Sequence, residues 1–440
     1  MKKRNWRLGT ILGLAVAMLT VFALGSNRPK QGTFAVHADD VSTKTEKKTT
    51  ITFWNAMSGS ASTALKQMTA DFEKAHPNIE VKLENQGDYS DLQGKLNSTM
   101  QNPSNLPTIT QAYPQWLYTA ATNGQLVDLK PYFDNSKIGF GSIQRSNIAK
   151  PFLEGATING KQYGVPFNKS TEVLFYNPDL LKKYGVKVPK TMAQLKQASK
   201  EIYEKSNHKV VGAGFDALNN YYVIGMKGYG DSFTSKLNFD SKDSKKVINY
   251  YADGVKDGYF QIAGAQKYMY LPFSNGKVAM FIGASSSEQY IKPTHANYAV
   301  AARPSKNNLQ QGTDIYMFKN ASKAQRTAAF EYMKFLTEPK QQLYWAKTTG
   351  YMPVNNQVLK SNSYKNLADT KVPQVLSNST ANMFTMPVIK NSNTAFVQLN
   401  QIMQDILTHP NSNRNQLINY LMFLNLTYAV SSALKFFNFC

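Results

Sequence analysis

Apolar residues in the first third of the chain recur at two alternating spacings, which predicts strands alternating with helices. Residues 50–53 and 79–83 place apolar side chains at every second position, as half-buried strands do. Between them, apolar residues in 65–72 recur at helical spacing, and a second helix is expected over 91–101. A third strand is expected over 107–112. This order indicates a parallel sheet covered by helices, so the fold class is α/β.

Local start and stop signals extend this pattern into the rest of the chain. Asn159-Gly160 is typical of a hairpin turn. Asn177 precedes Pro178 and predicts the start of a short helix that ends at Gly185. Thr191 predicts a second helix start. Gly350 is expected to end a helix near residues 339–349.

One stretch in the middle of these predicted elements combines strand-like and polar character. Residues 165–177 read VPFNKSTEVLFYN, in which two apolar runs flank the four polar residues NKST. The stretch contains no Gly, and its only Pro precedes the polar residues, which argues against a turn. We therefore predict a strand that crosses between two lobes, with its polar residues facing a cleft.

The ends of the first three predicted strands carry candidate binding residues. In parallel sheets, ligands gather beyond the carboxyl ends of the strands. Trp54, Tyr89 and the segment 113–116 lie at three such ends and could form one wall of a polar-ligand cleft. Tyr351, just after the predicted helix end, is a further candidate. The alternative interpretation is that these are ordinary rim residues and that Tyr351 packs against its helix.

Composition and charge narrow the class of protein. The chain has 440 residues, 42% of them hydrophobic and 18% charged, which favours a folded protein of two or three domains. The formal net charge of +22 suits an anionic surface or ligand, but no nucleic-acid motif accompanies it. We expect no nucleic-acid partner and interpret most of the charge as a solvated basic surface.

The N-terminal segment 1–38 is typical of a secretory signal, with a basic start, an apolar stretch and a small residue at its end. The alternative is an uncleaved membrane anchor. Cys440 is the only cysteine, so no disulfide within the chain, no thiolate metal site and no lipid-anchored signal are expected. The apolar tail 419–440 is open to three interpretations: a buried helix, a weak anchor or a disrupted reading frame.

No constellation of residues argues for catalysis. The five histidines do not fall at metal-ligand spacing, and residues 283–287 lack the last glycine of a nucleophile elbow. Gly212 to Ala217 fits G-x-G-x-x-A, but 218–222 reads as a poor helix start, so dinucleotide binding is disfavoured. Paired carboxylates of a glycoside hydrolase need no fixed spacing and stay open. We expect no enzyme activity, no cofactor and no metal.

Five stretches together resemble one family. They are TTITFWNAMSG (49–59), FEKAHPNIEVKL (72–83), VPFNKSTEVLFYNPDLLKKYG (165–185), FSNGKVAMFIGASSS (273–287) and FLTEPKQQLYWAKTTGYMPVNN (335–356). They resemble the extracellular solute-binding proteins of ABC importers, and among these most the glycerol-3-phosphate-binding subfamily.

The resemblance implies a two-lobed periplasmic-binding-protein type II fold with crossing strands. It implies a signal over 1–38, a linker over 39–49, and two discontinuous lobes. Lobe 1 would cover 50–168 plus 310–348, and lobe 2 would cover 169–309 plus 349–440. The ligand contacts of the family match Tyr89, Ser170, Phe215, Ser285 (or the neighbouring Ser286), Gly312 and Tyr351.

Two departures from the subfamily put a phosphate ligand in question. Its carboxylate at the end of strand three aligns with Pro114, and its phosphate-pairing arginine aligns with 390–392, where no Arg stands. An Arg fork grips phosphate through two bonds, whereas Lys is a point charge. Lys390 or Lys169 could substitute. Otherwise, the ligand would be a neutral oligosaccharide or a glycerophosphodiester.

The resemblance therefore implies a secreted, non-enzymatic and monomeric protein that delivers a polar ligand to membrane permease subunits. It would be extracellular and associated with the cell surface. Two alternatives come from other classes of protein: a secreted carbohydrate-active hydrolase, and a basic cell-wall-associated adhesion protein.

Overall fold

The computed structural model describes residues 41, 48–264, 268–376, 383–409 and 418. The predicted signal over 1–38 and the apolar tail 419–440 lie outside the described residues. Within the predicted linker, Val41 packs into a hydrophobic core and is only 7% exposed. None of the helices in the described part of the chain has the length and apolar character needed to cross a membrane.

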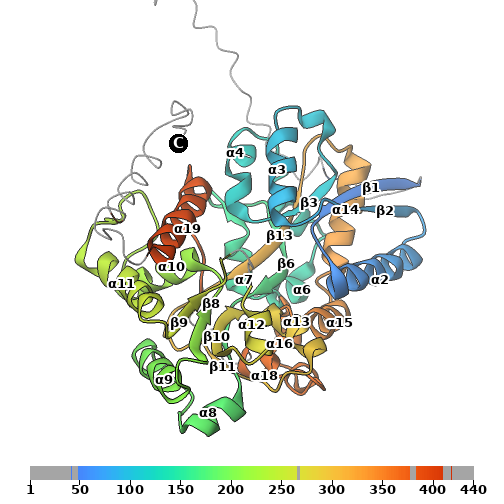
Figure 1. The fold of residues 1–440 in the computed structure, drawn as a ribbon. Helices are drawn as coiled ribbons and strands as arrows, with labels where there is room; N and C mark the ends of the chain where they lie inside the picture. Colours follow the sequence, from blue (N-terminus) through green and yellow to red (C-terminus); the bar gives the residue numbers. More distant parts are fainter. Residues whose placement is uncertain (1–40, 42–47, 265–267, 377–382, 410–417, 419–440) are drawn as a thin grey trace, which may run out of the picture. The chain divides into compact units, whose positions relative to one another are not determined.

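The first sheet has five strands and contains the three that the apolar pattern predicts (Figure 1). In spatial order they are β2 (Ile79–Asn85), β1 (Thr49–Asn55), β3 (Ile109–Ala112), β13 (Gln311–Met317) and β6 (Gly164–Ser170). β1 pairs in parallel with β2 and β3, which confirms the predicted parallel core. β13 runs antiparallel to both β3 and β6, so the complete sheet is mixed.

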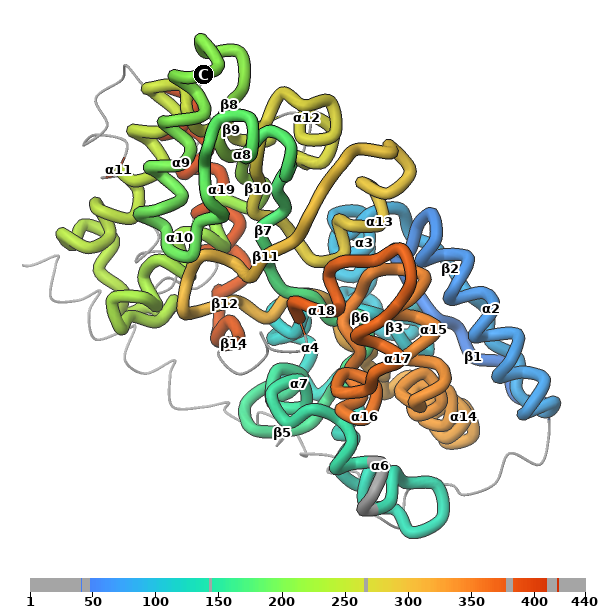
Figure 2. Tube along the Cα trace, turned by 90° about the horizontal axis from the view of Figure 1, so that it is seen from below, coloured from blue at the N-terminus to red at the C-terminus, as the bar shows by residue number. Residues whose placement is uncertain are grey.

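The second sheet is also mixed and has five strands. In spatial order they are β11 (Ala299–Ala302), β7 (Glu172–Tyr176), β10 (Val278–Ala284), β8 (Val211–Phe215) and β9 (Phe260–Ile262). β7 is antiparallel to β10 and β11, whereas β8 is parallel to β9 and β10. Two short pairs complete the pattern: β4 (Thr157–Ile158) with β5 (Lys161–Gln162), and β12 (Asn308–Leu309) with β14 (Met383–Phe384), the latter visible in Figure 2.

Helices surround both sheets. Those nearest the first sheet are α2 (Gly59–Ala75), α3 (Tyr89–Thr99), α4 (Tyr118–Thr122), α5 (Lys130–Phe133), α6 (Gly141–Asn147), α7 (Lys150–Gly155), α14 (Lys323–Phe335) and α15 (Pro339–Thr349). The remaining helices of at least four residues are α8 (Pro178–Tyr184), α9 (Met192–Lys205), α10 (Leu218–Gly228), α11 (Lys242–Lys256), α12 (Tyr270–Ser274), α13 (Glu288–Ile291), α16 (Asn356–Lys360), α17 (Asn362–Lys365), α18 (Val372–Leu376) and α19 (Ser392–Thr408). The 3-10 turns that matter for the site are η3 (Pro114–Leu117) and η5 (Ser285–Ser287).

The predicted helix boundaries and the predicted hairpin are confirmed. The Asn177 side chain accepts bonds from the backbone N–H groups of Asp179 and Leu180 at 3.0 and 3.1 Å, as an N-cap does. Gly185 and Gly350 end their helices with φ of 68° and 73°, values that suit glycine. Asn159 and Gly160 likewise adopt positive φ in the turn between β4 and β5.

One local expectation is wrong. Residues 218–222 were expected to be a poor helix start, yet α10 begins at Leu218 directly after β8. Tertiary packing overrides the weak local signal, because Tyr221 and Tyr222 are fully buried in the hydrophobic core that packs on the second sheet. The glycines of this motif have a packing role instead: a Cβ at Gly212 would lie 2.1 Å from the Ser199 Cα.

The chain passes from the first sheet to the second through one residue. β6 ends at Ser170, β7 begins at Glu172, and only Thr171 separates them. A second passage joins β11, β12 and β13. The predicted crossing strand is thus present at NKST. However, residues 168–171 are no more than 4% exposed, so this strand is a buried junction rather than an open cleft wall.

Candidate functional site

Three segments of chain meet at the junction around Thr171. The Thr171 hydroxyl donates to the Leu309 carbonyl at 3.0 Å, and its own carbonyl accepts the Ser285 N–H at 2.7 Å. The Met352 N–H donates to the Lys169 carbonyl at 2.7 Å. Backbone groups that are far apart in the sequence are therefore fixed against one another, and side chains from both sheets converge here.

A cavity of about 280 Å³ lies beside this junction. Its walls come from α3, η3, β13, α10 and α19, with Lys169 of β6 among them. We call it the junction cavity. Its described lining consists of Gln93, Tyr113, Pro114, Gln115, Trp116, Gly155, Lys169, Asn219, Asn220, Leu309, Gln310, Gln311, Gly312, Thr385, Met386, Asn393, Phe396 and Val397.

Aromatic rings form one end of the junction cavity. The ring centroids of Tyr113 and Trp116 are 5.2 Å apart, and Tyr89 lies 5.8 and 6.1 Å from them in edge-to-face geometry. The Tyr89 hydroxyl is 3.4 Å from that of Tyr351, whose ring stacks on Trp345 at 5.8 Å. Rings from the ends of two strands and one helix thus gather at a single place.

The tyrosine hydroxyls of this cluster are neutral donors. Burial raises the pKa of Tyr113 well above its usual range, and the nearby Tyr351 acts in the same direction. Burial and the same neighbour also raise the pKa of Tyr89, while a bond from the Asn168 amide at 2.9 Å opposes this shift. Both phenols stay protonated at physiological pH and can donate hydrogen bonds.

Lys169 is the only charged side chain among the described residues that line the junction cavity. Its ammonium forms an ion pair with Asp314 at 2.5 Å, and the two side chains are 2% and 0% exposed. Burial raises the pKa of Asp314, whereas Lys169 and the Tyr316 hydroxyl at 3.4 Å favour its ionised form. The charge that Lys169 brings to the cavity is therefore balanced by a carboxylate behind it.

A second buried ion pair supports another part of the cavity wall. The Arg303 Nε lies 2.8 Å from the Glu172 Oε2, and both side chains are at most 2% exposed. The amides of Asn220 and Gln311 donate to the Glu172 Oε1 at 3.1 and 3.0 Å. Both amides also line the junction cavity. Glu172 thus fixes the orientation of two polar groups that a bound molecule would meet.

Gly312 allows the strands beside the cavity to approach closely. Its φ is +90°, and a Cβ at this position would lie 1.9 Å from the Asn168 carbonyl oxygen. An L-residue would be strained by the backbone conformation and would also clash. This geometry gives a structural reason for glycine at the predicted contact.

The predicted contacts differ in their relation to the cavity. Gly312 and Lys169 line it, and Tyr89 and Tyr351 lie at its aromatic end. Ser170 pairs in register with Gln311 and is 4% exposed. Ser285 is fully buried, and its hydroxyl has no hydrogen-bond partner among the described residues.

Three other predicted residues lie elsewhere. Phe215 is fully buried, with the rings of Tyr251 and Phe260 at 5.1 and 4.9 Å, so it belongs to the core of the second sheet. The Trp54 Nε1 donates to Glu84 at 2.7 Å, and Trp54 is only 6% exposed. Lys390 is exposed and precedes α19, outside the lining of the junction cavity.

Several residues that line the junction cavity were not predicted from the sequence. Gln93 stands one helical turn after Tyr89, so its presence on the same face could have been found from spacing. Asn219 and Asn220 follow a strand end, but 218–222 reads as a poor helix start, so the sequence does not place them at a site. Asn393 and Phe396 of α19 carry no local signal, because only tertiary packing brings them to the cavity.

One carboxyl group near the site has an unusual proton affinity. Burial raises the pKa of Asp216 to about 7, and the charge of Glu172 acts in the same direction. The Met269 N–H donates to the Asp216 Oδ1 at 2.6 Å and partly opposes the shift. Among the described residues there is no group of three or more His, Cys, Asp or Glu that could hold a metal ion.

Comparison with known proteins identifies the family to which this architecture belongs. Residues 67–373 match the model of the family described as bacterial extracellular solute-binding protein. The sn-glycerol-3-phosphate-binding periplasmic protein of Salmonella typhimurium is 25% identical over 330 residues, which cover 70% of this chain and 74% of that protein.

Solved structures agree on the fold. An ABC substrate-binding protein from Listeria monocytogenes in complex with cycloalternan superimposes with a TM-score of 0.75 at 21% identity, over 88% of this chain and 100% of the other. A Mycobacterium tuberculosis protein in complex with glycerophosphocholine gives a TM-score of 0.73 at 18% identity, over 87% and 98%. With a family model that matches most of its length and a two-lobed fold of this type, the chain belongs to the bacterial extracellular solute-binding protein family.

Proposed function

We propose that this protein captures a neutral, polyhydroxylated ligand of the oligosaccharide class in the junction cavity. The observation that carries the proposal is the charge balance of the site. The only cation among the described lining residues, Lys169, already pairs with the buried carboxylate of Asp314. A phosphate ligand would have to compete with that carboxylate at 2.5 Å.

The remaining lining suits hydroxyl groups. Seven amide side chains line the cavity, and an amide can both donate to and accept from a hydroxyl. The rings of Tyr113 and Trp116 offer apolar faces on which a sugar ring can stack. Of the residues predicted from the sequence, Gly312 lines the junction cavity, and we propose Tyr89, Ser170, Ser285 and Tyr351 as further contacts near it. The unpartnered hydroxyl of Ser285 supports its role as a hydrogen-bonding contact. Phe215, Trp54, Lys169 and Lys390 are not proposed as contacts with this ligand.

A phosphate-bearing ligand is the second candidate, and one observation favours it. Ser392, at the start of α19, is 1% exposed, and its hydroxyl has no hydrogen-bond partner in the described part of the chain. Lys390 lies two residues before it, and the next residue, Asn393, lines the junction cavity. A phosphodiester could place its phosphate at this helix start. The relative named for glycerol-3-phosphate and the neighbour solved with glycerophosphocholine are consistent with this candidate.

Delivery to an ABC importer permease completes the proposal. Solved neighbours are named as ABC substrate-binding proteins, and the family is described as extracellular. We propose that the protein is secreted, acts as a monomer without enzyme activity, binds no nucleic acid, and is associated with the cell surface. Two discontinuous lobes would close on the ligand, with boundaries close to 168/169, 309/310 and 348/349, and the closed form would be what the permease recognises.

A thermal-shift panel tests the ligand class. The purified protein is heated with millimolar maltose, maltotriose, glycerol, glycerol-3-phosphate or glycerophosphocholine. A ligand at about 100 times its dissociation constant stabilises the folded state by roughly 2.7 kcal/mol, which raises the unfolding midpoint. We expect the sugars to raise the midpoint and the phosphates to leave it unchanged. A shift with the phosphates alone contradicts the neutral-ligand proposal and favours the second candidate.

A pair of variants locates the site. Trp116→Ala removes a ring from the junction cavity and should abolish the shift caused by the sugars. Tyr229→Ala removes a ring that is 49% exposed and absent from the cavity lining, so it should leave the shift intact. Equal shifts in both variants would place the ligand elsewhere.

A further inference from the structure

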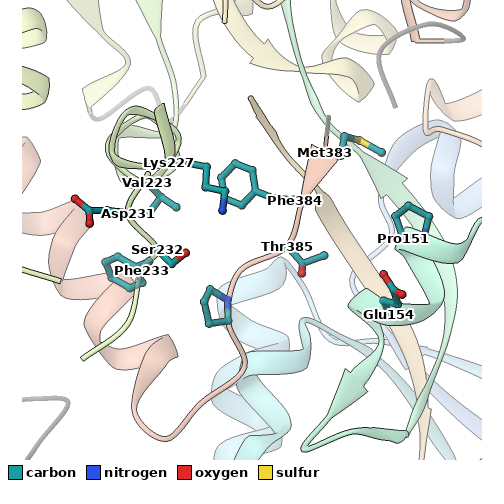
Figure 3. Close-up of a pocket in the computed structure, with 11 residues that line it drawn as sticks. Pro151, Glu154, Val223, Lys227, Asp231, Ser232, Phe233, Met383, Phe384 and Thr385 are labelled. Carbon is teal, nitrogen blue, oxygen red and sulfur yellow. The ribbon is translucent and has the colours of Figure 1, made fainter. Parts of the chain in front are cut away.

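A second cavity, of about 250 Å³, shares a lining residue with the junction cavity. Figure 3 shows its lining. Residues on α7, the end of α10 and the segment around β14 form its walls. We call it the β14 cavity. Its lining consists of Pro151, Glu154, Val223, Lys227, Asp231, Ser232, Phe233, Met383, Phe384, Thr385 and Pro387.

Residues shared or adjacent in the fold connect the two cavities. Thr385 lines both of them. On α7, Glu154 lines the β14 cavity, and the next residue, Gly155, lines the junction cavity. The rings of Phe233 and Phe396, one from each cavity, have centroids 5.9 Å apart. The two cavities are thus adjacent.

One face of α10 runs along both cavities. Asn219 lines the junction cavity, while Val223 and Lys227 line the β14 cavity. These residues are spaced by four positions, so they lie above one another on the same side of the helix. A molecule lying along this face would pass from one cavity into the other.

The sizes of the cavities support a combined site. Binding pockets for small molecules usually measure about 300–1,000 Å³. Each cavity alone lies below that range, at about 280 and 250 Å³, whereas together they reach about 530 Å³. An elongated ligand would use the combined volume.

The chemistry of the β14 cavity suits hydroxyl groups rather than anions. The carboxylates of Glu154 and Asp231 and the hydroxyls of Ser232 and Thr385 can accept hydrogen bonds from a polyol. The Lys227 ammonium lies 5.7 Å from the centroid of the Phe384 ring, a cation–π distance. Two carboxylates against one cation repel a phosphate.

We propose that the two cavities form one elongated site, in which the β14 cavity holds sugar units that extend beyond those held in the junction cavity. This inference rests on the proposed oligosaccharide function. It makes chain length a determinant of affinity and assigns Phe384 and Ser232 to the outer end of the ligand.

Calorimetric titration with sugars of increasing length tests the inference. The probes are the maltose-to-maltohexaose and cellobiose-to-cellohexaose series, titrated into the full-length protein. In the series that binds, we expect at least a tenfold gain in affinity from the disaccharide to the tetrasaccharide. Ser232→Trp, which fills the β14 cavity, and Phe384→Ala should remove this gain and leave the disaccharide affinity within twofold.

A control variant distinguishes loss of the β14 cavity from a general effect of adding a large side chain. Ser98→Trp places the same bulk on an exposed position of α3, outside both linings, and should leave the gain intact. Affinity independent of chain length, or an equal gain in Ser232→Trp and in the unchanged protein, overturns the inference while the proposed function stands. Binding of no sugar in either series overturns the proposed function and this inference with it.

Discussion

The two buried ion pairs beside Thr171 have similar distances but different surroundings. Glu172 and Arg303 are 2.8 Å apart, and the amides of Asn220 and Gln311 also bond to Glu172. Lys169 and Asp314 are 2.5 Å apart, and the Tyr316 hydroxyl at 3.4 Å gives Asp314 only a weak additional bond. The carboxylate of the first pair thus accepts bonds from Arg303, Asn220 and Gln311 and supports the cavity wall. The carboxylate of the second pair has fewer partners among the described residues, and its cation lines the cavity.

This difference follows from the chemistry of the two cations. Arg stays charged at every accessible pH and forms several directed bonds, so it suits a permanent buried scaffold. Lys is a point charge with no fixed fork of donors, so its pairing is less directed. We therefore expect the first pair to act as a scaffold and the second to set the charge of the site.

Removing the carboxylate of the scaffold should have the largest effect. Glu172→Gln leaves the buried Arg303 charge without its counter-ion, so we expect the free energy of unfolding to fall by about 3–5 kcal/mol. Denaturant unfolding followed by circular dichroism measures the loss. Glu201→Gln, which breaks the exposed pair with Lys205, is the control and should cause no measurable loss. A similar stability for both variants would show that the pair is not a scaffold.

Removing the carboxylate of the second pair should cost less. Asp314→Asn leaves Lys169 unpaired, and we expect a loss of about 2–3 kcal/mol at pH 7. Calorimetric titration should also reveal a gain in affinity for glycerol-3-phosphate, because the Lys169 charge is no longer balanced. Unchanged phosphate binding would show that this pair does not set the charge of the site.

The Asp216 carboxyl reports on the scaffold pair. Its pKa is raised to about 7, so the folded state holds a proton that the unfolded state releases near pH 4. The stability that this group contributes is present below pH 4 and is lost as pH rises towards 7. Asp216→Asn should therefore raise the free energy of unfolding at pH 8 by about 1–2 kcal/mol. The gain is smaller than the full difference in pKa would give, because the side chain is partly exposed and solvent screens its charge.

Unfolding midpoints measured from pH 4 to 8 check this dependence, and Asp216→Asn should flatten it. Because the charge of Glu172 contributes to the raised pKa of Asp216, Glu172→Gln should move the dependence to lower pH. Identical profiles for Asp216→Asn and the unchanged protein would refute this titration.

The smallest effect concerns the extra bond to Asp314. Tyr316→Phe removes the hydroxyl at 3.4 Å, and we expect a loss of about 1 kcal/mol in denaturant unfolding. The matched change Tyr229→Phe on the exposed surface should be neutral. A loss above that of Asp314→Asn would mean that Tyr316, rather than Lys169, stabilises the carboxylate.

Local patterns predicted the strands, the helix ends and the position of the crossing. Asn177, Gly185 and Gly350 each act through the backbone of their immediate neighbours, so their roles can be derived from sequence. Glu172 and Arg303 stand 131 positions apart, and no periodicity relates them. Phe215 is predicted from the family resemblance alone, and its surroundings depend on rings that tertiary packing supplies. Contacts between distant segments are therefore the part that the sequence did not predict, except where neighbouring strand ends bring residues together, as they do Tyr89 and Tyr113.

The single residue between β6 and β7 also limits how one sheet can move against the other. Ser170 and Glu172 are held in separate sheets, so a change in their relative orientation concentrates in very few backbone torsions near Thr171. Thr171 is β-branched, and both its hydroxyl and its carbonyl are bonded, which narrows the torsions available. A mechanical load applied across the two sheets would thus meet a short, stiff axis. The same twist would also have to deform the second passage between the sheets, through β11, β12 and β13.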